Sequence, residues 1–326
     1  MMMDPEQKIP FSSALDSLFM DETVSVPLLF RLSDMAEADF ALFKERWPAV
    51  DDSRRRVIVR HLVDISEENY VVNFSPVFAF CFDDALPAVR VAALDGLWDQ
   101  TNLRLVGPII TLLQQDESVE VQAAAASALA HFILMAEWGE IPRTMSPRIV
   151  EALLTAYDGV DTAVPVKRAA LEALGAADHP RIATLIQEAY AGNDPDMRLS
   201  AVFAMGSSAD ERWIPDLLVA MRSEDANMRV EAARAAGSIG HEDALPTLAH
   251  LAVEEDLEIA LTVVEALGNI GSEKAHKMLV QMGEDEHFAR LHEAVAEALE
   301  EMDWIGGELE MLDFSGSDFD DEELIA

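Results

Sequence analysis

This chain of 326 residues has few cysteines, few basic residues and few aromatic side chains. Its single cysteine, Cys81, excludes an internal disulfide and a zinc site built from several thiolates. Only 23 Lys and Arg residues stand against 61 Asp and Glu residues, which gives a formal net charge of −38. Because phosphate neutralisation needs clustered Lys and Arg, this balance disfavours direct nucleic-acid binding. It is compatible with a basic protein partner, and the alternative is a solvated acidic surface that keeps the chain soluble.

Long apolar runs are also missing. The longest, around residues 123–136, is interrupted by Ser127 and His131 and is too short to span a bilayer. Residues 1–8 contain Asp4 and Glu6, and no long apolar stretch follows them. We therefore predict no secretory signal and no membrane insertion, and we expect a cytoplasmic protein.

What the chain does contain is an internal repeat of about 31 residues, which is typical of stacked solenoids. In each unit a turn is followed by an alanine-rich helix, and another helix precedes the turn. Counting from the turn residue, position five is apolar, positions eight and nine are mostly small, and position twelve is Gly or Ala. These positions share one helical face, so they predict close stacking between successive helices. The turn residues are Asp84, Asp116, Asp161, Gly192, Ser223, Glu254 and Glu286.

This pattern resembles HEAT repeats, in particular the bacterial repeats of the phycobilisome-lyase type. The resemblance covers about residues 33–302 and implies an all-α fold, a right-handed α-solenoid of about eight HEAT-like helix pairs. A degenerate first pair is expected at residues 33–47 and 53–65. We place an N-terminal arm or partial cap at residues 1–23, the solenoid at 24–302 and an acidic tail at 303–326.

The resemblance also implies a ladder in which the turn aspartate and a basic residue six positions later link adjacent layers. The implied pairs are Asp84 with Arg90 and Asp161 with Lys167. Departures from this ladder occur at Gln122, Ala260 and His292. Several helices reach a glycine near their ends, where we expect left-handed caps; these are Gly175, Gly206, Gly237 and Gly268.

The repeat is interrupted once, between Asp116 and Asp161, where the interval is longer than elsewhere. The extra residues lie around 137–142, and we expect a loop that carries Trp138 beside two carboxylates. Insertions in solenoids lie on a rim and often bind partners, which makes Trp138 a candidate binding residue. The alternative is a tolerated loop with Trp138 folded onto its own helix.

His292 and Glu293 are weak metal candidates. Residues 291–299 are similar to a His-Glu motif of deoxyhypusine hydroxylase, a di-iron enzyme built from the same repeats. That site needs four such pairs on second helices, and one pair does not hold two irons. We therefore expect His292 to fill the basic position of the ladder, and we predict no cofactor. The equivalent positions hold Arg90-Val91, Lys167-Arg168, Arg198-Leu199 and Arg229-Val230.

A second enzymatic alternative is bilin attachment or detachment, as in the phycobilisome lyases. This alternative depends on the repeats alone, since the sequence carries no nucleophile constellation, Gly-rich phosphate loop or zinc motif. We therefore predict a non-catalytic scaffold for protein–protein contacts.

Position eleven of the second helices leaves the apolar stripe and is expected to face the concave side. Acidic groups are prominent there, and Phe203 lies beside Arg234, which predicts a groove for a basic or amphipathic helical segment. Alternatively, Phe203 packs between layers and the charges are merely solvated. The candidate partner-binding residues at this position are Asp95, Glu172, Phe203, Arg234 and Glu265.

Residues 303–326 depart from the repeat. They include nine acidic residues and no basic ones, alternating with apolar side chains. This composition predicts a disordered tail that folds against a partner; the alternative is a solubilising extension whose first part caps the last repeat.

Overall fold

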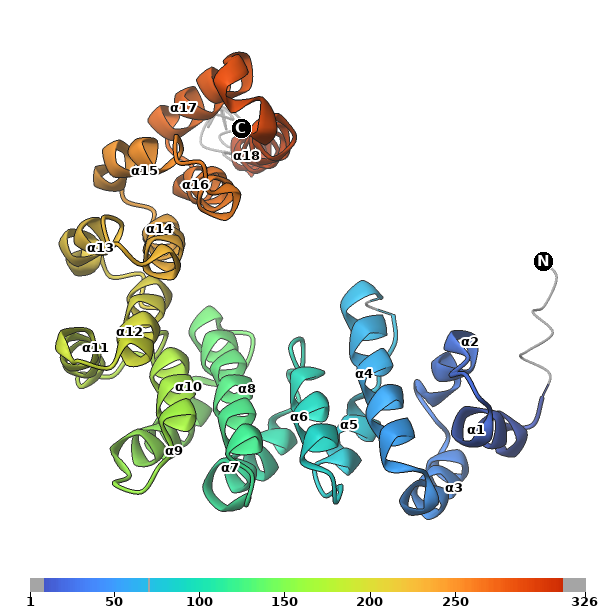
Figure 1. The fold of residues 1–326 in the computed structure, drawn as a ribbon. Coiled ribbons are helices and arrows are strands. Elements are labelled where there is room, and N and C mark those ends of the chain that lie inside the picture. The colour runs from blue at the N-terminus through green and yellow to red at the C-terminus, as the bar shows by residue number, and fades with distance from the viewer. Residues whose placement is uncertain (1–8, 70, 313–326) are drawn as a thin grey trace, which may run out of the picture. The chain divides into compact units, whose positions relative to one another are not determined.

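The computed structural model describes residues 9–69 and 71–312, and the regular elements of that part are all helices. The chain divides into two units, Met1–Leu185 and Ile186–Ala326, which we describe separately. Within each unit, successive second helices lie side by side, and most first helices contact the second helix that follows them in the chain (Figure 1). The predicted all-α solenoid of HEAT-like helix pairs is confirmed.

The helices of the first unit are α1 (Phe11–Met20), α2 (Val26–Leu29), α3 (Glu37–Arg46), α4 (Asp52–Glu68), α5 (Ser75–Cys81), α6 (Pro87–Asp95), α7 (Val106–Gln115), α8 (Val119–Trp138), α9 (Ser146–Asp158) and α10 (Val164–Leu174). Helix α11 (Ile182–Ala191) crosses the division between the units. The second unit continues with α12 (Pro195–Ser207), α13 (Ile214–Ala220), α14 (Ala226–Ile239), α15 (Leu245–Leu251), α16 (Leu257–Ile270), α17 (Glu273–Glu284) and α18 (His292–Leu312).

The apolar stripe of the repeat forms the core of both units. Second helices contact one another in the order α4, α6, α8, α10 in the first unit and α12, α14, α16, α18 in the second. Their position-five residues are almost all buried, which confirms the predicted stacking face; the buried ones are Val89, Val121, Val166, Met228, Ile259 and Leu291.

The glycines near the helix ends do not form left-handed caps, so that prediction is wrong. Gly206 and Gly237 lie inside α12 and α14, and the left-handed caps fall later, at Gly240 and Gly271. A Cβ added to Gly237 would lie 2.7 Å from the Cα of Ala266 in the next second helix, and Gly206 is equally close to its neighbouring layer. Glycine is required at both positions because the backbones of successive layers approach one another there and leave no room for a Cβ.

The interruption of the repeat is taken up mainly by a longer helix rather than by a loop. Helix α8 runs on to Trp138, and Gly139 ends it in the left-handed conformation with φ of 82°. Among the described residues, α8 is the one helix long and apolar enough to cross a membrane, with a mean hydropathy of 1.5 over its window. It packs against α6, α7 and α10 through buried residues such as Leu129 and Phe132, as the core helix of a repeat array does.

Both ends of the described chain extend the stack. Helix α1 packs on α3 and buries Phe11, Leu15 and Leu18; it lies within residues 1–23, where the sequence predicts an N-terminal arm or partial cap. Helix α18 continues to Leu312, so the boundary predicted at residue 303 falls inside a helix. Residues 313–326, the rest of the predicted tail, lie outside the described residues.

The interlayer ladder exists, but Arg90 and Arg229 each bind the turn carboxylate of the next layer rather than one in their own unit. Arg90 donates from Nη1 to the backbone carbonyl of Asp84 at 2.7 Å, and binds the Asp116 carboxylate of the next layer through Nε and Nη2. Arg229 likewise binds the carbonyl of Ser223 and the Glu254 carboxylate. The turn carboxylate is thus held by the arginine of the preceding layer. No hydrogen bond or ion pair joins Asp161 to Lys167 in the part of the chain described here.

Candidate partner-binding surface

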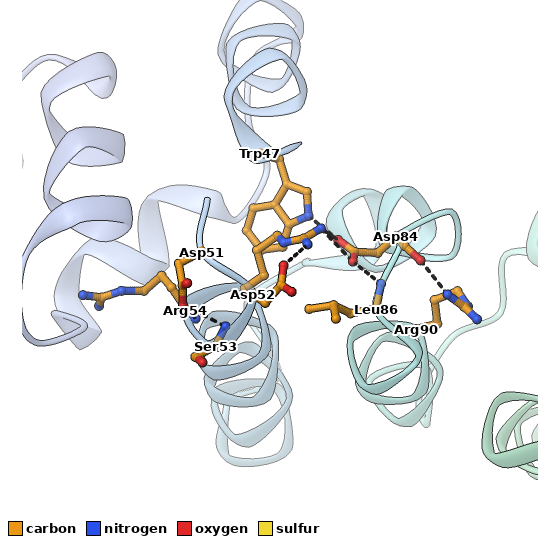
Figure 2. A network of polar contacts seen from close by, with 9 residues as sticks. Trp47, Asp51, Asp52, Ser53, Arg54, Asp84, Leu86 and Arg90 are labelled. Carbon is orange, nitrogen blue, oxygen red and sulfur yellow. Dashed lines mark hydrogen bonds and ion pairs between the residues drawn. The ribbon is translucent and has the colours of Figure 1, made fainter. Parts of the chain in front are cut away.

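The buried carboxylate of Asp84 joins the first two layers through a network of polar contacts (Figure 2). Asp84, whose side chain is fully buried, accepts hydrogen bonds from Trp47 Nε1 at 2.7 Å and from the backbone N–H of Leu86 at 2.9 Å. Arg55 Nη1 donates to both of its oxygens, at 2.8 and 2.7 Å. Asp51 caps the start of α4 by accepting from the backbone N–H of Ser53. The start of α6 is therefore fixed against the first turns of α4.

A groove of about 670 Å³ opens on the exposed side of these two helices, which is within the usual size range of binding pockets. Its floor is mainly apolar, and Val57 remains 38% exposed there. Two exposed arginines of α4, Arg56 and Arg60, stand one helical turn apart along one side. The lining residues are Arg56, Val57, Arg60, His61, Pro87, Ala88, Val91, Ala92 and Glu120.

The charge of this groove differs from the acidic surface that the sequence predicts. Arg60 Nη1 binds the Asp95 carboxylate at 3.1 Å, while Arg56 forms no hydrogen bond or ion pair among the described residues. Burial raises the pKa of the Asp95 carboxyl, and the neighbouring Arg60 opposes that rise. Glu120 is the single acidic residue of the lining, and the Ser118 hydroxyl donates to it at 2.6 Å.

The predicted binding residues of the first unit therefore lie in different settings. Asp95 is exposed on α6 and paired with Arg60, so it lies beside the groove. Glu172 is half-buried on α10. Trp138 is the last residue of α8 and is 69% exposed.

The second unit brings its predicted residues onto three consecutive second helices. Phe203 on α12 is 42% exposed, so it is not enclosed between layers. Arg234 on α14 is half-buried and binds Glu231 on its own helix at 2.9 Å, and Glu265 on α16 is exposed. Helix α14 contacts both α12 and α16, so the three residues occupy equivalent positions in neighbouring layers. Leu261, also on α16, adds an apolar side chain that is 39% exposed.

The weak metal candidates do not gather further ligands. His292 Nε2 lies 3.1 Å from the backbone carbonyl of Asp285, so it contacts the turn as Arg90 and Gln122 contact the turns of their own layers. Among the described residues, no group of three or more His, Cys, Asp or Glu side chains is placed to hold a metal ion. Glu293 is exposed beside His292.

Sequence reasoning missed Arg56 and Arg60 as site residues. Arg60 pairs across the layer with Asp95, so it stands where position eleven of a first repeat unit would be. The signal was available, because four arginines fall within residues 54–60 of a chain that has only 23 basic residues. It was hidden because the turn of the first pair departs from the repeat, which leaves the register of α4 undefined in sequence.

Comparison with known proteins identifies the class of protein. Residues 182–258 and 214–300 match the family model of HEAT repeats. No curated protein matches the chain. The chain therefore folds as an α-solenoid of HEAT-like helix pairs, and residues 182–300 are the part whose sequence matches the HEAT-repeat model.

Solved structures extend the fold to most of the chain. The complex of CpcE and CpcF of phycocyanin lyase from Nostoc sp. PCC7120 is 17% identical, with a TM-score of 0.54, over 93% of this chain and 99% of that chain. The Escherichia coli protein YibA (17% identity, TM-score 0.45) covers 87% of this chain and 99% of its own. Human deoxyhypusine hydroxylase in complex with glycerol (18% identity, TM-score 0.35) covers 86% and 96%. The resemblance to repeats of the phycobilisome-lyase type is thus confirmed at the level of the fold.

Proposed function

We propose that this protein is a non-catalytic, cytoplasmic scaffold that binds other proteins through the exposed faces of its second helices. The observation that carries the proposal is the exposure of Phe203 on α12, with Arg234 and Glu265 at the equivalent positions of the next two layers. Aromatic and arginine side chains are enriched at protein interfaces, and a few such anchors dominate affinity. The core stripe and the ladder hold the layers together, so these off-stripe side chains remain for a partner.

The charge of the second-helix face supports selection between partners. Glu265 is exposed in the second unit and Glu172 is half-buried in the first, and both favour a basic or amphipathic helical segment. Because exposed charges act through solvent, they mainly speed encounter and exclude wrong partners, while Phe203 supplies buried apolar area. Trp138, exposed at the end of α8, is a second aromatic anchor, available in the first unit.

The proposal excludes the two enzymatic alternatives, a bilin lyase and a deoxyhypusine hydroxylase. Two positions where a di-iron enzyme of this fold would need histidines hold Arg90 and Arg229, and both arginines are engaged in the interlayer ladder. His292 contacts the turn carbonyl in the same manner. The likeness to the phycocyanin lyase complex is one of fold, at 17% identity, and supports no shared chemistry.

Affinity capture with the full chain as bait tests the proposal. The bait is used unchanged, as a face variant combining Asp95→Asn, Glu172→Gln and Phe203→Ser, and as a control variant with Asp16→Asn. Asp16 is an exposed carboxylate on α1, paired with Arg46 and remote in sequence from the repeat positions. We expect a partner that the unchanged bait and the control retain and that the face variant loses. Equal retention by all three baits, at low and moderate salt, would overturn the assignment of this surface.

A further inference from the structure

We propose that the groove between α4 and α6 binds an acidic segment of a partner protein, with carboxylates against α4 and an apolar side chain in the floor. This inference rests on the proposed function and adds a second contact to it: the first unit takes an acidic segment at α4 and α6, apart from the basic or amphipathic segment that Glu172 and Glu265 favour. Its basis is the pairing of two arginines with an apolar floor in one concave site of about 670 Å³.

One side of the groove is cationic. Arg56 and Arg60 are exposed on the same face of α4, one turn apart. Arg56 has no ion pair or hydrogen bond among the described residues, and Arg60 has a single contact at 3.1 Å to Asp95. Guanidinium groups bind carboxylates in a bidentate manner, so both arginines retain donors for a ligand. These two arginines thus carry a local positive charge in a chain whose net charge is −38.

The floor of the groove is apolar. Val57 of α4 is 38% exposed, and it lines the groove together with Val91 of α6. A purely ionic ligand such as inorganic phosphate would leave this floor in contact with water. A peptide with a bulky apolar side chain next to its carboxylates would cover the floor and bind the guanidinium groups together.

Two carboxylates oppose an acidic ligand and thereby fix its orientation. Glu120, at the start of α8, is held by the Ser118 hydroxyl, whose hydrogen bond lowers the pKa of that carboxyl. Asp95 is already paired with Arg60. The ligand's carboxylates are therefore repelled from α8 and drawn towards α4, beside Arg56. Removing the charge of Glu120 should strengthen binding, which is a gain that damage to the fold would not produce.

The probe is a fluorescent peptide with the sequence of residues 313–326, which carries six carboxylate side chains, two phenylalanines and no basic residue. Its binding to the full chain is measured by anisotropy at about 0.05 M and about 0.3 M salt, where screening differs strongly. We expect saturable binding that weakens with salt. A peptide with Asn and Gln in place of its acids, and one with Ser in place of its phenylalanines, should each bind at least about tenfold more weakly, since charge and apolar burial both contribute.

Substitutions in the full chain locate the site. Arg56→Gln and Arg60→Gln should each weaken binding about fivefold, and Glu120→Gln should strengthen it about twofold, as exposed charge pairs do. Arg54→Gln is the matched control, because it removes the same charge two residues before Arg56. Arg54 points away from the Asp84 network in Figure 2 and does not line the groove.

Four results would overturn the inference. They are equal weakening by Arg54→Gln and Arg56→Gln, binding of a charge-matched oligoribonucleotide as tight as that of the peptide, no binding of the peptide at any salt, or binding only after the chain's own residues 318–323 are neutralised. The last result would assign the groove to the chain's own C-terminal segment. A partner captured through Phe203 while the peptide fails to bind would remove this inference alone and leave the proposed function standing.

Discussion

Replacing Asp84 with alanine should destabilise the first unit by about 3–5 kcal/mol, the range measured when one partner of a buried ion pair is removed. The substitution leaves the Arg55 guanidinium, only 8% exposed, with Asp52 as its remaining carboxylate, and Asp52 is itself 67% exposed. It also removes the acceptor of the Trp47 indole N–H and of the Leu86 backbone N–H. Each buried donor left unpaired adds a cost of about 1–3 kcal/mol, so the upper part of the range is expected.

Urea denaturation followed by tryptophan fluorescence measures the change in the free energy of unfolding. Because solenoids unfold in parts, hydrogen exchange is needed beside it, comparing amides of α4 and α6 with those of α14 in the second unit. The loss of protection should be confined to α4, α6 and their neighbours. Asp16→Ala is the matched control: it breaks an exposed pair with Arg46 and should cost less than about 1 kcal/mol.

A double variant separates burial of charge from packing. Arg55→Met combined with Asp84→Leu removes both charges, and should cost much less than Asp84→Ala alone, because apolar replacement of a buried pair is often near neutral. If Asp84→Ala costs no more than Asp16→Ala, the account of the first two layers is wrong.

Three further outcomes are expected. Gly237→Ala places a Cβ 2.7 Å from the Cα of Ala266 and should cost about 1–3 kcal/mol in thermal or chemical unfolding, whereas Gly268→Ala, whose Cβ meets only an ordinary contact at 3.6 Å, should be neutral or stabilising. Burial lowers the pKa of His131 below its ordinary 6.5. The neutral ring therefore contributes stability above pH 6.5, and this contribution is lost as the pH falls and the unfolded chain takes up the proton first. Denaturation curves at several pH values should show this pH-dependent component of the free energy of unfolding in the unchanged chain and not in His131→Gln. Metal analysis of chain purified with added iron should find no stoichiometric iron, with no difference on His292→Gln; one or two bound irons would favour the hydroxylase alternative.

The repeat allowed the fold to be predicted almost helix by helix. Small residues at positions eight, nine and twelve mark where second helices meet, and burial of Val89, Val121 and Val166 follows directly from that stripe. Periodicity works here because each layer contacts only its neighbours, so local pattern and tertiary contact coincide.

Two features depended on distances between layers, which sequence does not give. Gly237 was expected to cap a helix, and instead lies where two backbones nearly touch. Arg90 was paired with Asp84 of its own unit, yet its guanidinium reaches the next layer's Asp116. In both cases the residue types were recognised correctly, and the choice of partner was decided by how far one layer stands from the next.

The candidate surface was predicted only in part. The sequence did not decide whether Phe203 is exposed, because an aromatic ring at that position packs inward or outward depending on the size of its neighbours. The groove beside Arg56 was not predicted, because its floor combines residues of α4 and α6 whose relative placement is set by the buried Asp84 contacts.

The central claim is that the second-helix faces bind a protein partner, and quantitative affinity capture from the native host tests it most directly. Mass spectrometry should find at least one protein that the unchanged full chain retains and that the Phe203→Ser bait retains at a level at least about tenfold lower, as expected for loss of an aromatic anchor. The Asp16→Asn control bait should retain the protein fully. Capture that is equal for all three baits, or the absence of any protein that distinguishes them from a blank resin, would contradict the account.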